Sequence, residues 1–470
     1  MSDILRCDVA VIGAGTAGLA AERAARSNGA KTLLIDPEYK GTTCATDGCM
    51  PSKLLIAAAH AAHAARSAET FGVTVSDIAI DGKAVMQRVR DERDRFARLT
   101  RENIADIPDY IRLSGCAKFV APQCLELDDG RLIEARSIVI ATGSAPFVPD
   151  EFSVLGKRLL TNENIFDLPD LPERLAVIGS GPIGLELAQA MARLGVEVTL
   201  FDLGERLGGI RCDKVHAALK AIIEDDLTLK LGVEVKASAT EKGASLTWSG
   251  QSTGQADFDH VLVATGRPPN LGSLNLVAAG IALDEDGIPV HDRETMQCGD
   301  SAIFLAGDVA DDLPLLHEAS HDGAIAGRNA VAVPAAVAVD RFTPFSIIFT
   351  SPPVARIGRS KDEGVVTGTA GFSDQGRARV EGINEGVLTL YAAAPDGRLI
   401  GADLCAPAGE HLAHMLAWAI QQRQTATQLL EMPFYHPTIE EGLKQALRTI
   451  CAATPLELPQ DQDRGDPPGA

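Results

Sequence analysis

The hydrophobic pattern near the start of the chain predicts a strand, a turn, a helix and a second strand in quick succession. An apolar run at residues 7–12 leads directly into a glycine-rich turn. Apolar residues recur at helical spacing over 19–28, and a second apolar run at 31–35 ends at Asp36. The turn has the spacing GxGxxG, with glycines at Gly13, Gly15 and Gly18. This order of elements is typical of a dinucleotide-binding unit.

Each glycine of this turn has its own physical role. The first allows the turn, the second lets the backbone approach a pyrophosphate, and the third lets helix and strand pack closely. The pyrophosphate is expected at the helix N-terminus, where free N–H groups and the helix dipole favour an anion. Asp36 is expected to accept hydrogen bonds from ribose hydroxyls.

The same pattern recurs in the middle of the chain. An apolar run at 175–178 precedes the second turn, a helical pattern follows at 185–194, and a run at 196–201 ends at Asp202. The glycines of this second turn are Gly179, Gly181 and Gly184. Two such units predict two bound dinucleotides with hydride transfer between them; the alternative is that one unit is vestigial. Asp202 favours NAD over NADP, because its charge repels a 2′-phosphate.

Each unit is closed by an apolar strand that ends in Ala-Thr-Gly. The first such strand, at 138–143, ends with Thr142 and Gly143, and the second, at 261–266, ends with Gly266. Small residues at these points let the chain cross beneath a bound dinucleotide. Their pairing with the two glycine turns strengthens the prediction of two dinucleotide-binding folds.

Between and after the two units, the pattern predicts further helices and a separate domain. An alanine-rich helix is expected at 54–68, and a charged helix with a solvated face at 85–104. From Phe342 the sequence pattern changes and predicts a separate α+β domain. Its expected strands are at 345–349, 386–391 and 399–405, and its expected helices are at 410–424 and 439–452. The tail from Pro455 is rich in Pro, Asp and Gln, which predicts disorder.

Length and charge narrow the classes of function. A chain of 470 residues corresponds to about three domains. It contains 64 acidic and 43 basic residues, a net charge of −21, and only 4 % aromatic residues. This balance disfavours nucleic acid and anionic membrane surfaces as partners. No apolar run reaches about 18 residues, and the N-terminus lacks the features of a signal peptide, so a cytoplasmic location is expected.

The nine cysteines are not expected to form a disulfide framework, because cytoplasmic thiols stay reduced. Seven are isolated and expected to be small buried hydrophobic residues: Cys7, Cys116, Cys124, Cys212, Cys298, Cys405 and Cys451. Cys44 and Cys49 differ, because two cysteines five residues apart can be bridged around the first turns of a helix. A helix N-terminus also lowers a thiol pKa. No second pair or matching histidines indicate zinc, so no metal site is predicted; the alternative is two buried structural cysteines.

The segment from Gly41 to Cys44 and from Cys49 to Lys53 resembles the redox-disulfide segment of the flavin-dependent pyridine nucleotide–disulfide oxidoreductases. Three further segments match that family in order and spacing: 304–308, 349–353 and 436–441. The resemblance implies an α/β fold with two Rossmann-like domains and a C-terminal α+β dimerisation domain. Its implied boundaries are an FAD-binding domain (1–150), an NAD-binding domain (151–271), a central segment completing the FAD domain (272–340), a dimer-interface domain (341–455) and a flexible tail (456–470).

Within the family the chain most resembles the dihydrolipoamide dehydrogenases. The resemblance implies FAD and NAD as cofactors and a homodimer that oxidises the lipoyl group of a carrier protein, or free dihydrolipoamide. By position, Cys49 is the thiol nearest the flavin, and Cys44 is the outer thiol that exchanges with the substrate. His436 is implied as the acid/base that acts across the dimer, oriented by Glu441.

The resemblance also implies a set of residues around the cofactors. Lys53 is expected near the flavin and paired with Glu186, while Asp308 is expected to hold the ribityl chain. The resemblance also implies that further residues bind the cofactors, in addition to the glycines and acids of the two turns. These residues are Thr43, Lys53, Ala117, Thr142, Gly143, Glu186, Gly266 and Leu316.

Thiol–disulfide exchange needs a thiolate, a base to form it and an acid for the leaving sulfur. Histidine is the residue type whose chemistry suits both roles near neutral pH, which favours His436 as the candidate. Mercuric reductases usually carry tyrosine at this place and a C-terminal cysteine pair, and glutathione reductases favour NADPH. Thr42 and the Ala-Thr-Asp sequence at 45–47 depart from the family pattern, and Asp47 should raise the pKa of a neighbouring thiol. Another disulfide reductase, or a redox-sensing NAD(H)-binding flavoprotein, therefore remains an alternative.

Overall fold

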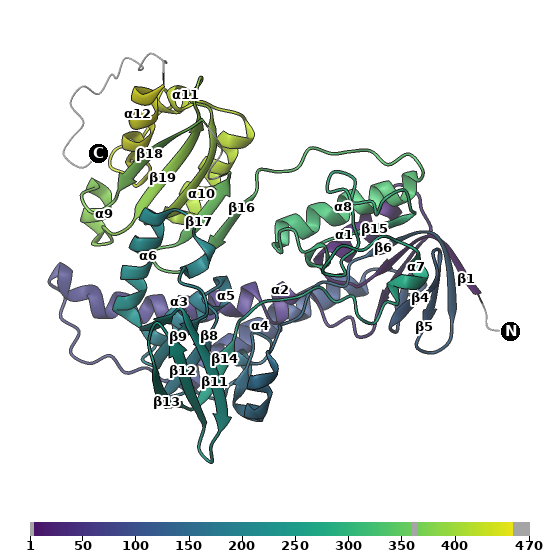
Figure 1. Cartoon of the computed structure of the whole chain (residues 1–470), viewed down its shortest axis with the longest axis horizontal. Helices are drawn as coiled ribbons and strands as arrows, with labels where there is room; N and C mark the ends of the chain where they lie inside the picture. Colours follow the sequence, from purple (N-terminus) through teal and green to yellow (C-terminus); the bar gives the residue numbers. More distant parts are fainter. Residues whose placement is uncertain (1–3, 360–363, 455–470) are drawn as a thin grey trace.

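The computed structural model describes residues 4–359 and 364–454. Its first sheet has seven strands in the order β3-β2-β1-β6-β5-β4, with β15 beside β6. The strands are β1 (Ile4–Ile12), β2 (Thr32–Asp36), β3 (Arg112–Ser114), β4 (Ala117–Ala121), β5 (Cys124–Leu127), β6 (Leu132–Ile140) and β15 (Ile303–Leu305). β2, β1, β6 and β15 are parallel, and helices α1 (Thr16–Ser27) and α8 (Leu316–Ala332) pack on one another beside them (Figure 1).

A helical excursion leaves the first sheet after β2. It consists of α2 (Thr43–Thr46), α3 (Cys49–Ser67), the short 3-10 turn η1 (Ala68–Phe71) and α4 (Gly82–Ala105). Helix α4 buries Met86, Val89, Ala97 and Ile104 and exposes most of its charged residues, as the sequence predicts. Arg93 is an exception, since its side chain is mostly covered and pairs with Asp167. Helix α3 starts at Cys49, earlier than the predicted alanine-rich stretch.

The second sheet is parallel and has the order β10-β9-β8-β14-β7. Its strands are β7 (Leu159–Leu160), β8 (Arg174–Ile178), β9 (Glu197–Asp202), β10 (Thr228–Leu231) and β14 (His260–Val263). The associated helices are α5 (Pro182–Arg193) and α6 (Asp213–Asp226), with 3-10 turns η2 (Asp150–Arg158), η3 (Ile165–Asp167) and η4 (Leu207–Gly209). Helix α7 (Leu276–Ala279) packs on β4 of the first sheet, and the 3-10 turn η5 (Asp308–Ala310) follows β15 of that sheet. An antiparallel sheet of β11 (Val233–Ala239), β12 (Ala244–Gly250) and β13 (Gly254–Phe258) is attached to it.

The C-terminal domain is a five-stranded antiparallel sheet in the order β16-β17-β20-β19-β18, covered by helices (Figure 1). Its strands are β16 (Phe345–Ile348), β17 (Val354–Gly358), β18 (Val365–Gly371), β19 (Val387–Ala393) and β20 (Leu399–Cys405). Its helices are α9 (Gly376–Glu381), α10 (Gly409–Gln421), α11 (Ala426–Leu430), the 3-10 turn η6 (Glu440–Gly442) and α12 (Leu443–Ala453). An extended connection after α8 leads into it (Figure 1).

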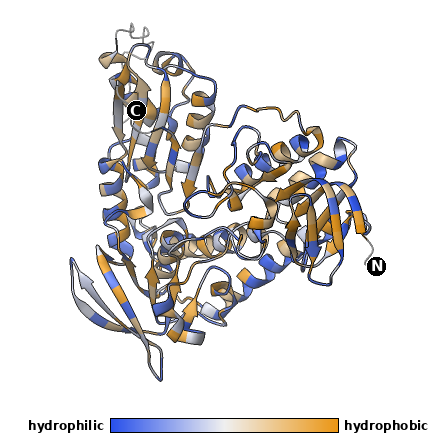
Figure 2. Cartoon of the chain, turned by 45° about the vertical axis from the view of Figure 1, so that its right-hand side comes forward, coloured by the Kyte–Doolittle hydropathy of each residue, from blue (hydrophilic) through white to orange (hydrophobic). Residues whose placement is uncertain are grey.

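The predicted fold class is confirmed, with two parallel-sheet units and a C-terminal α+β domain. Many strand residues are apolar, as the orange segments of the strands in Figure 2 show, and such residues form buried clusters at the sheets. Strands β17 and β18 were not among the predicted elements. The predicted disorder from Pro455 lies outside the described residues. Across the described ranges, none of the helices has the length and apolarity needed to cross a membrane.

Candidate active site

The first glycine turn is tightly built against its own backbone. Gly13 has φ +102°, and a Cβ added there would lie 2.4 Å from the Ala141 carbonyl oxygen. A Cβ on Gly18 would lie 1.8 Å from the Gly13 carbonyl oxygen. At Gly15, by contrast, nothing lies within 4 Å of the added Cβ. No contact within the protein therefore requires a glycine at position 15. This fits a site that leaves room for a ligand at the start of α1.

The second turn repeats this geometry. Gly179 has φ +104°, and a Cβ on Gly184 would lie 1.9 Å from its carbonyl oxygen, whereas Gly181 faces open space. The carboxylate of Asp202 accepts hydrogen bonds from the N–H and hydroxyl of Ser180, both at 2.6 Å. The N–H of Ala14 donates to Asp36 in the first unit at 2.9 Å. Each acid thus closes its own glycine turn, and both turns present a helix N-terminus without a side-chain cap.

The Ala-Thr-Gly segments and Asp308 lie where the two units meet. Thr142 Oγ1 donates to the carbonyl of Asn270 at 2.8 Å, and the Asn270 side chain donates back to the Thr142 carbonyl at 3.1 Å. Gly143 and Gly266 have positive φ angles with nothing within 4 Å of an added Cβ. The carboxylate of Asp308 accepts from the Ser144 hydroxyl at 3.1 Å.

Three further residues that the family resemblance implies in cofactor binding differ in their exposure. Ala117 is buried in β4 within the core of the first sheet, so only its backbone can face a ligand. Leu316 is 49 % exposed at the first turn of α8. Thr43 is exposed at the start of α2, immediately before Cys44.

Cys44 and Cys49, the predicted redox pair, lie on consecutive helices, and both are free thiols. Cys44 is in α2, and Cys49 begins α3. A hydrogen bond between the two thiols raises the pKa of Cys44, with burial adding to the effect. The same bond lowers the pKa of Cys49 to about 6; the charge of Lys53 also lowers it, while burial and Glu186 oppose the shift. The expectation that Asp47 should raise a thiol pKa is not met at Cys49, and the Asp47 carboxylate accepts from the Thr46 hydroxyl at 2.9 Å.

The predicted pairing of Lys53 with Glu186 is present. Lys53 Nζ lies 2.7 Å from Glu186 Oε2, and the pair joins α3 of the first unit to α5 of the second. Glu186 is buried, and its other oxygen accepts from the backbone N–H of Phe349 at 2.9 Å. Lys53 Nζ is also 4.4 Å from the centre of the Phe349 ring. Phe349 belongs to a matching segment, but no sequence pattern singled out its ring.

His436 and Glu441 also form the predicted pair. His436 Nδ1 lies 3.1 Å from Glu441 Oε2, and that oxygen also accepts from the Thr438 N–H at 3.1 Å. Glu441 is buried, and its second oxygen lies 3.7 Å from Lys444 Nζ, whereas the His436 side chain is 53 % exposed. Within the described chain no hydrogen bond joins His436 to Cys44 or Cys49. The carboxylate therefore fixes the ring, and Nε2 is left for another molecule.

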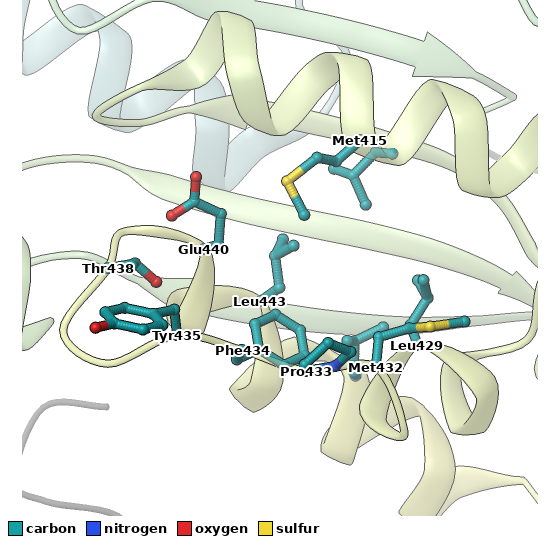
Figure 3. A pocket seen from close by; sticks show the side chains of 11 residues that line it. Met415, Leu429, Met432, Pro433, Phe434, Tyr435, Thr438, Glu440 and Leu443 are labelled. Atoms are coloured by element: carbon teal, nitrogen blue, oxygen red, sulfur yellow. The ribbon is translucent and has the colours of Figure 1, made fainter.

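An apolar pocket of about 330 Å³ adjoins the His436 loop. Figure 3 shows Met415, from α10, on one side and Phe434, Pro433 and Met432 on the other. Tyr435, directly before His436, is 84 % exposed at its edge. The loop that carries the histidine therefore has an apolar and aromatic margin.

The isolated cysteines only partly match the expectation of burial. Cys7, Cys298, Cys405 and Cys451 are buried, but Cys116 is exposed and Cys124 and Cys212 are intermediate. The prediction was wrong for Cys116, because this residue lies between two short strands rather than inside one. No cluster of three or more His, Cys, Asp or Glu side chains suited to a metal ion occurs among the described residues.

Comparison with known proteins places this architecture in a family. Residues 7–323 match the pyridine nucleotide-disulphide oxidoreductase model, and residues 344–447 match the dimerisation domain of the same family. The chain belongs to the pyridine nucleotide–disulphide oxidoreductases. Members of this family use FAD and NAD(H), and the dimerisation domain supports a homodimer.

Individual relatives carry different names. The chain is 30 % identical to a dihydrolipoyl dehydrogenase of Chlamydia muridarum over 469 residues, covering 96 % of this chain and 98 % of that protein. It is 33 % identical to a mercuric reductase of Acidithiobacillus ferrooxidans, covering 94 % and 82 %. LpdA from Mycobacterium tuberculosis has a similar fold, with TM-score 0.80, 24 % identity and coverage of 94 % and 99 %. The HOCl-induced flavoprotein disulfide reductase RclA from Escherichia coli has TM-score 0.80, 23 % identity and the same coverage.

Proposed function

We propose that the chain is an NAD-dependent dihydrolipoyl dehydrogenase that oxidises a dihydrolipoyl dithiol through Cys44 and Cys49. The observation that carries the proposal is the contact between two thiols with opposite pKa shifts. Cys49 has its pKa lowered to about 6 beside Lys53, whereas that of Cys44 is raised. This asymmetry gives one good leaving thiolate and one thiol that exchanges with substrate.

The reaction begins with the Cys44–Cys49 disulfide. His436 of the partner subunit accepts a proton from one substrate thiol, and the thiolate attacks Cys44 Sγ. The Cys44–Cys49 bond breaks, and Cys49 leaves as a thiolate stabilised by Lys53. The second substrate sulfur, after losing its proton to solvent, attacks the mixed disulfide; the substrate disulfide closes, and Cys44 leaves with the proton returned by His436. The substrate has lost two electrons and two protons.

The chain's own residues fit the two cofactors that complete the reaction. Gly13, Gly15, Gly18 and Asp36 would hold the FAD diphosphate and ribose, with Asp308 at the ribityl chain, and Gly179, Gly181, Gly184 and Asp202 would hold NAD. FAD supplies a two-electron relay between the dithiol and the nicotinamide. The ion pair of Lys53 and Glu186 joins the first unit to the second, and it places the ammonium group of Lys53 where its charge acts on Cys49. In the overall reaction, the dithiol and NAD⁺ are converted to the disulfide, NADH and one proton.

The site requires a second subunit. The buried Glu441 fixes Nδ1 of His436, whose side chain is 53 % exposed, and among the described residues no hydrogen bond joins this ring to Cys44 or Cys49. A two-fold dimer would bring His436 of one subunit to Cys44 of the other and generate two equal sites. Acid/base catalysis by a positioned histidine contributes about 10²–10⁴-fold in rate. His436→Gln should therefore slow dithiol oxidation far more than NADH oxidation by an artificial acceptor.

Subunit mixing tests this arrangement. Cys44→Ser chains and His436→Gln chains should each be inactive toward dihydrolipoamide while retaining FAD. In a mixed dimer one site carries both defects and the other carries neither, so activity should return after subunit exchange. Mixtures of demonstrated heterodimers that stay inactive would place the whole site within one chain.

A mercuric reductase is the second candidate, favoured by the 33 % identity to the Acidithiobacillus ferrooxidans enzyme. His436 and its buried carboxylate partner favour the dithiol reaction, since protons must be moved on substrate sulfur. Turnover of dihydrolipoamide, lipoylated carrier protein, glutathione disulfide and mercuric ion by one preparation separates these candidates. NADPH-dependent mercuric reduction without dihydrolipoamide turnover would overturn the dithiol proposal.

A further inference from the structure

The peptide carbonyl of Asp47 is held by a residue from a distant part of the chain. Asp47 ends α2 and lies between the two redox cysteines. Its carbonyl accepts a hydrogen bond from Asn162 Nδ2 at 2.9 Å. The last carbonyls of a helix have no partner within the helix, so this side chain satisfies one of them. Asn162 follows β7 of the second unit, 115 residues further along the chain.

Asn162 is itself fixed at its other end. It is buried, and its Oδ1 accepts from Arg267 Nη1 at 2.8 Å. One amide thus donates to the redox loop and accepts from a guanidinium, which leaves a single orientation for the side chain. Arg267 follows the second Ala-Thr-Gly segment directly, where the chain crosses back toward the first unit.

Arg267 is anchored to the first unit through Ser144. Its Nη2 donates to the Ser144 carbonyl at 2.8 Å, and its Nε donates to the Ser144 hydroxyl at 3.3 Å. Ser144 also donates to Asp308 at 3.1 Å and pairs with Pro269 in an isolated bridge. Hydrogen bonds therefore run from Asp308 through Ser144, Arg267 and Asn162 to the loop between the cysteines.

We propose that Asn162 and Arg267 are positioning residues that hold the loop between Cys44 and Cys49 in the geometry for disulfide closure. This inference rests on the proposed function of the two cysteines. Neither residue touches a sulfur; both act through the Asp47 carbonyl. A guanidinium with a rigid fork of donors suits this role, because it fixes Asn162 and Ser144 together.

The expected effect is on the equilibrium between dithiol and disulfide. A disulfide constrains the loop by itself, so an outside constraint matters most in the dithiol form, where it keeps the two thiols close. Removing it frees the dithiol loop and lowers the effective concentration of one thiol toward the other. The equilibrium constant for closing the disulfide should fall about tenfold, as expected for the loss of one buried hydrogen bond at this loop.

The test uses the FAD-loaded holoenzyme equilibrated with mixtures of reduced and oxidised dithiothreitol, with the Cys44–Cys49 disulfide counted by mass after alkylation. Asn162→Leu should shift the equilibrium about tenfold toward the dithiol with FAD content unchanged. Asn164→Leu is the matched control, because Asn164 holds only its own turn, accepting from the Thr161 N–H at 2.8 Å. It should change thermal stability without moving the equilibrium.

Two further variants separate positioning from general damage. Asn162→Asp keeps the contact with Arg267 and loses the donor to Asp47, so it should shift the equilibrium in the same direction even if Asn162→Leu folds poorly. Arg267→Leu combined with Asn162→Leu should shift it no further than Asn162→Leu alone, because both act through one contact. An unshifted equilibrium in folded Asn162→Asp overturns the positioning role alone. Wild-type protein that never forms the disulfide overturns the proposed function and this role with it.

Discussion

The two glycine turns are nearly identical, yet the helices that follow them have different roles. Gly13 and Gly179 have φ angles of +102° and +104°, and both would meet a carbonyl oxygen at 2.4 Å if a Cβ were added. Two residues after the third glycine, the first helix has Ala20 and the second has Glu186. Ala20 packs against α8, where its Cβ lies 2.9 Å from a Cβ added to Gly323. Glu186 instead reaches Lys53.

This difference extends along both helices. Helix α1 is pressed against α8, and a Cβ on Gly327 would lie 2.2 Å from the Ala21 carbonyl oxygen. Helix α5 carries buried polar side chains: Gln189 bonds to the Ser351 backbone, and Arg193 pairs with Asp226 at 2.9 Å. The turn thus adopts the same geometry in both units. The residues of the following helix determine whether that helix packs closely against a neighbouring helix, as α1 does, or forms polar contacts with Lys53 and the C-terminal domain, as α5 does.

The largest effect on stability is expected at the third glycine of each turn, where the two turns are closely alike. Gly18→Val and Gly184→Val place atoms within 2 Å of a backbone carbonyl that cannot retreat. Each should destabilise its own unit by about 3 kcal/mol or more. Scanning calorimetry should show the loss, with FAD absent in the first variant and NADH binding absent in the second. Equal retention of both cofactors would contradict the equivalence of the two turns.

A smaller effect, confined to binding, is expected at the open glycines. Gly15→Val and Gly181→Val meet no protein atom within 4 Å of the Cβ, so folding should be unchanged. Each side chain would fill the space of a diphosphate and weaken one cofactor about 100-fold, or ~2.7 kcal/mol. Flavin absorbance and NADH titration measure the two outcomes. Loss of the other cofactor instead would reverse the assignment of the units.

The acids at the strand ends sharpen the comparison further. Asp202 should favour NAD over NADP by about 10- to 100-fold in kcat/KM, because a carboxylate accepts from a 2′-hydroxyl and repels a 2′-phosphate. Asp202→Ala should reduce this ratio and leave the flavin content intact. Steady-state kinetics with both nucleotides decide the matter, and a wild-type preference for NADP would refute the role of Asp202.

The smallest effect is expected at Glu186, the residue of α5 that stands where α1 has Ala20. Its charge raises the pKa of Cys49, so Glu186→Gln should move that pKa from about 6 to a lower value, by less than about one pH unit. Because the thiolate is the reactive form, alkylation of Cys49 falls as pH drops through this pKa, and the variant should keep its reactivity to lower pH. Glu22→Gln, a buried acid in α1, is the control and should leave the profile unchanged.

Much of the site was predictable because it is encoded locally. The glycine turns, the acids that end their strands and the paired cysteines are short patterns whose chemistry depends on neighbouring residues. The pairs Lys53–Glu186 and His436–Glu441 followed from the family resemblance, and the structure contains both. By contrast, the sequence singled out neither Asn162 nor Arg267. An asparagine in a turn and an arginine after a strand are ordinary residues until their partners are known.

The sequence by itself determined the two dinucleotide-binding units, since steric limits on the backbone allow those glycine spacings few other structures. It also singled out Cys44 and Cys49 among the nine cysteines as the pair for which we propose a redox role. The tertiary structure alone decided that Asp47 directs its carboxylate to Thr46 while its carbonyl meets Asn162, and that Cys116 is exposed. Over the ranges 4–359 and 364–454 it also leaves His436 without a hydrogen bond to either cysteine of the pair. These outcomes depend on contacts between residues more than a hundred positions apart, or between neighbours whose orientation is set by packing, and no local pattern records them.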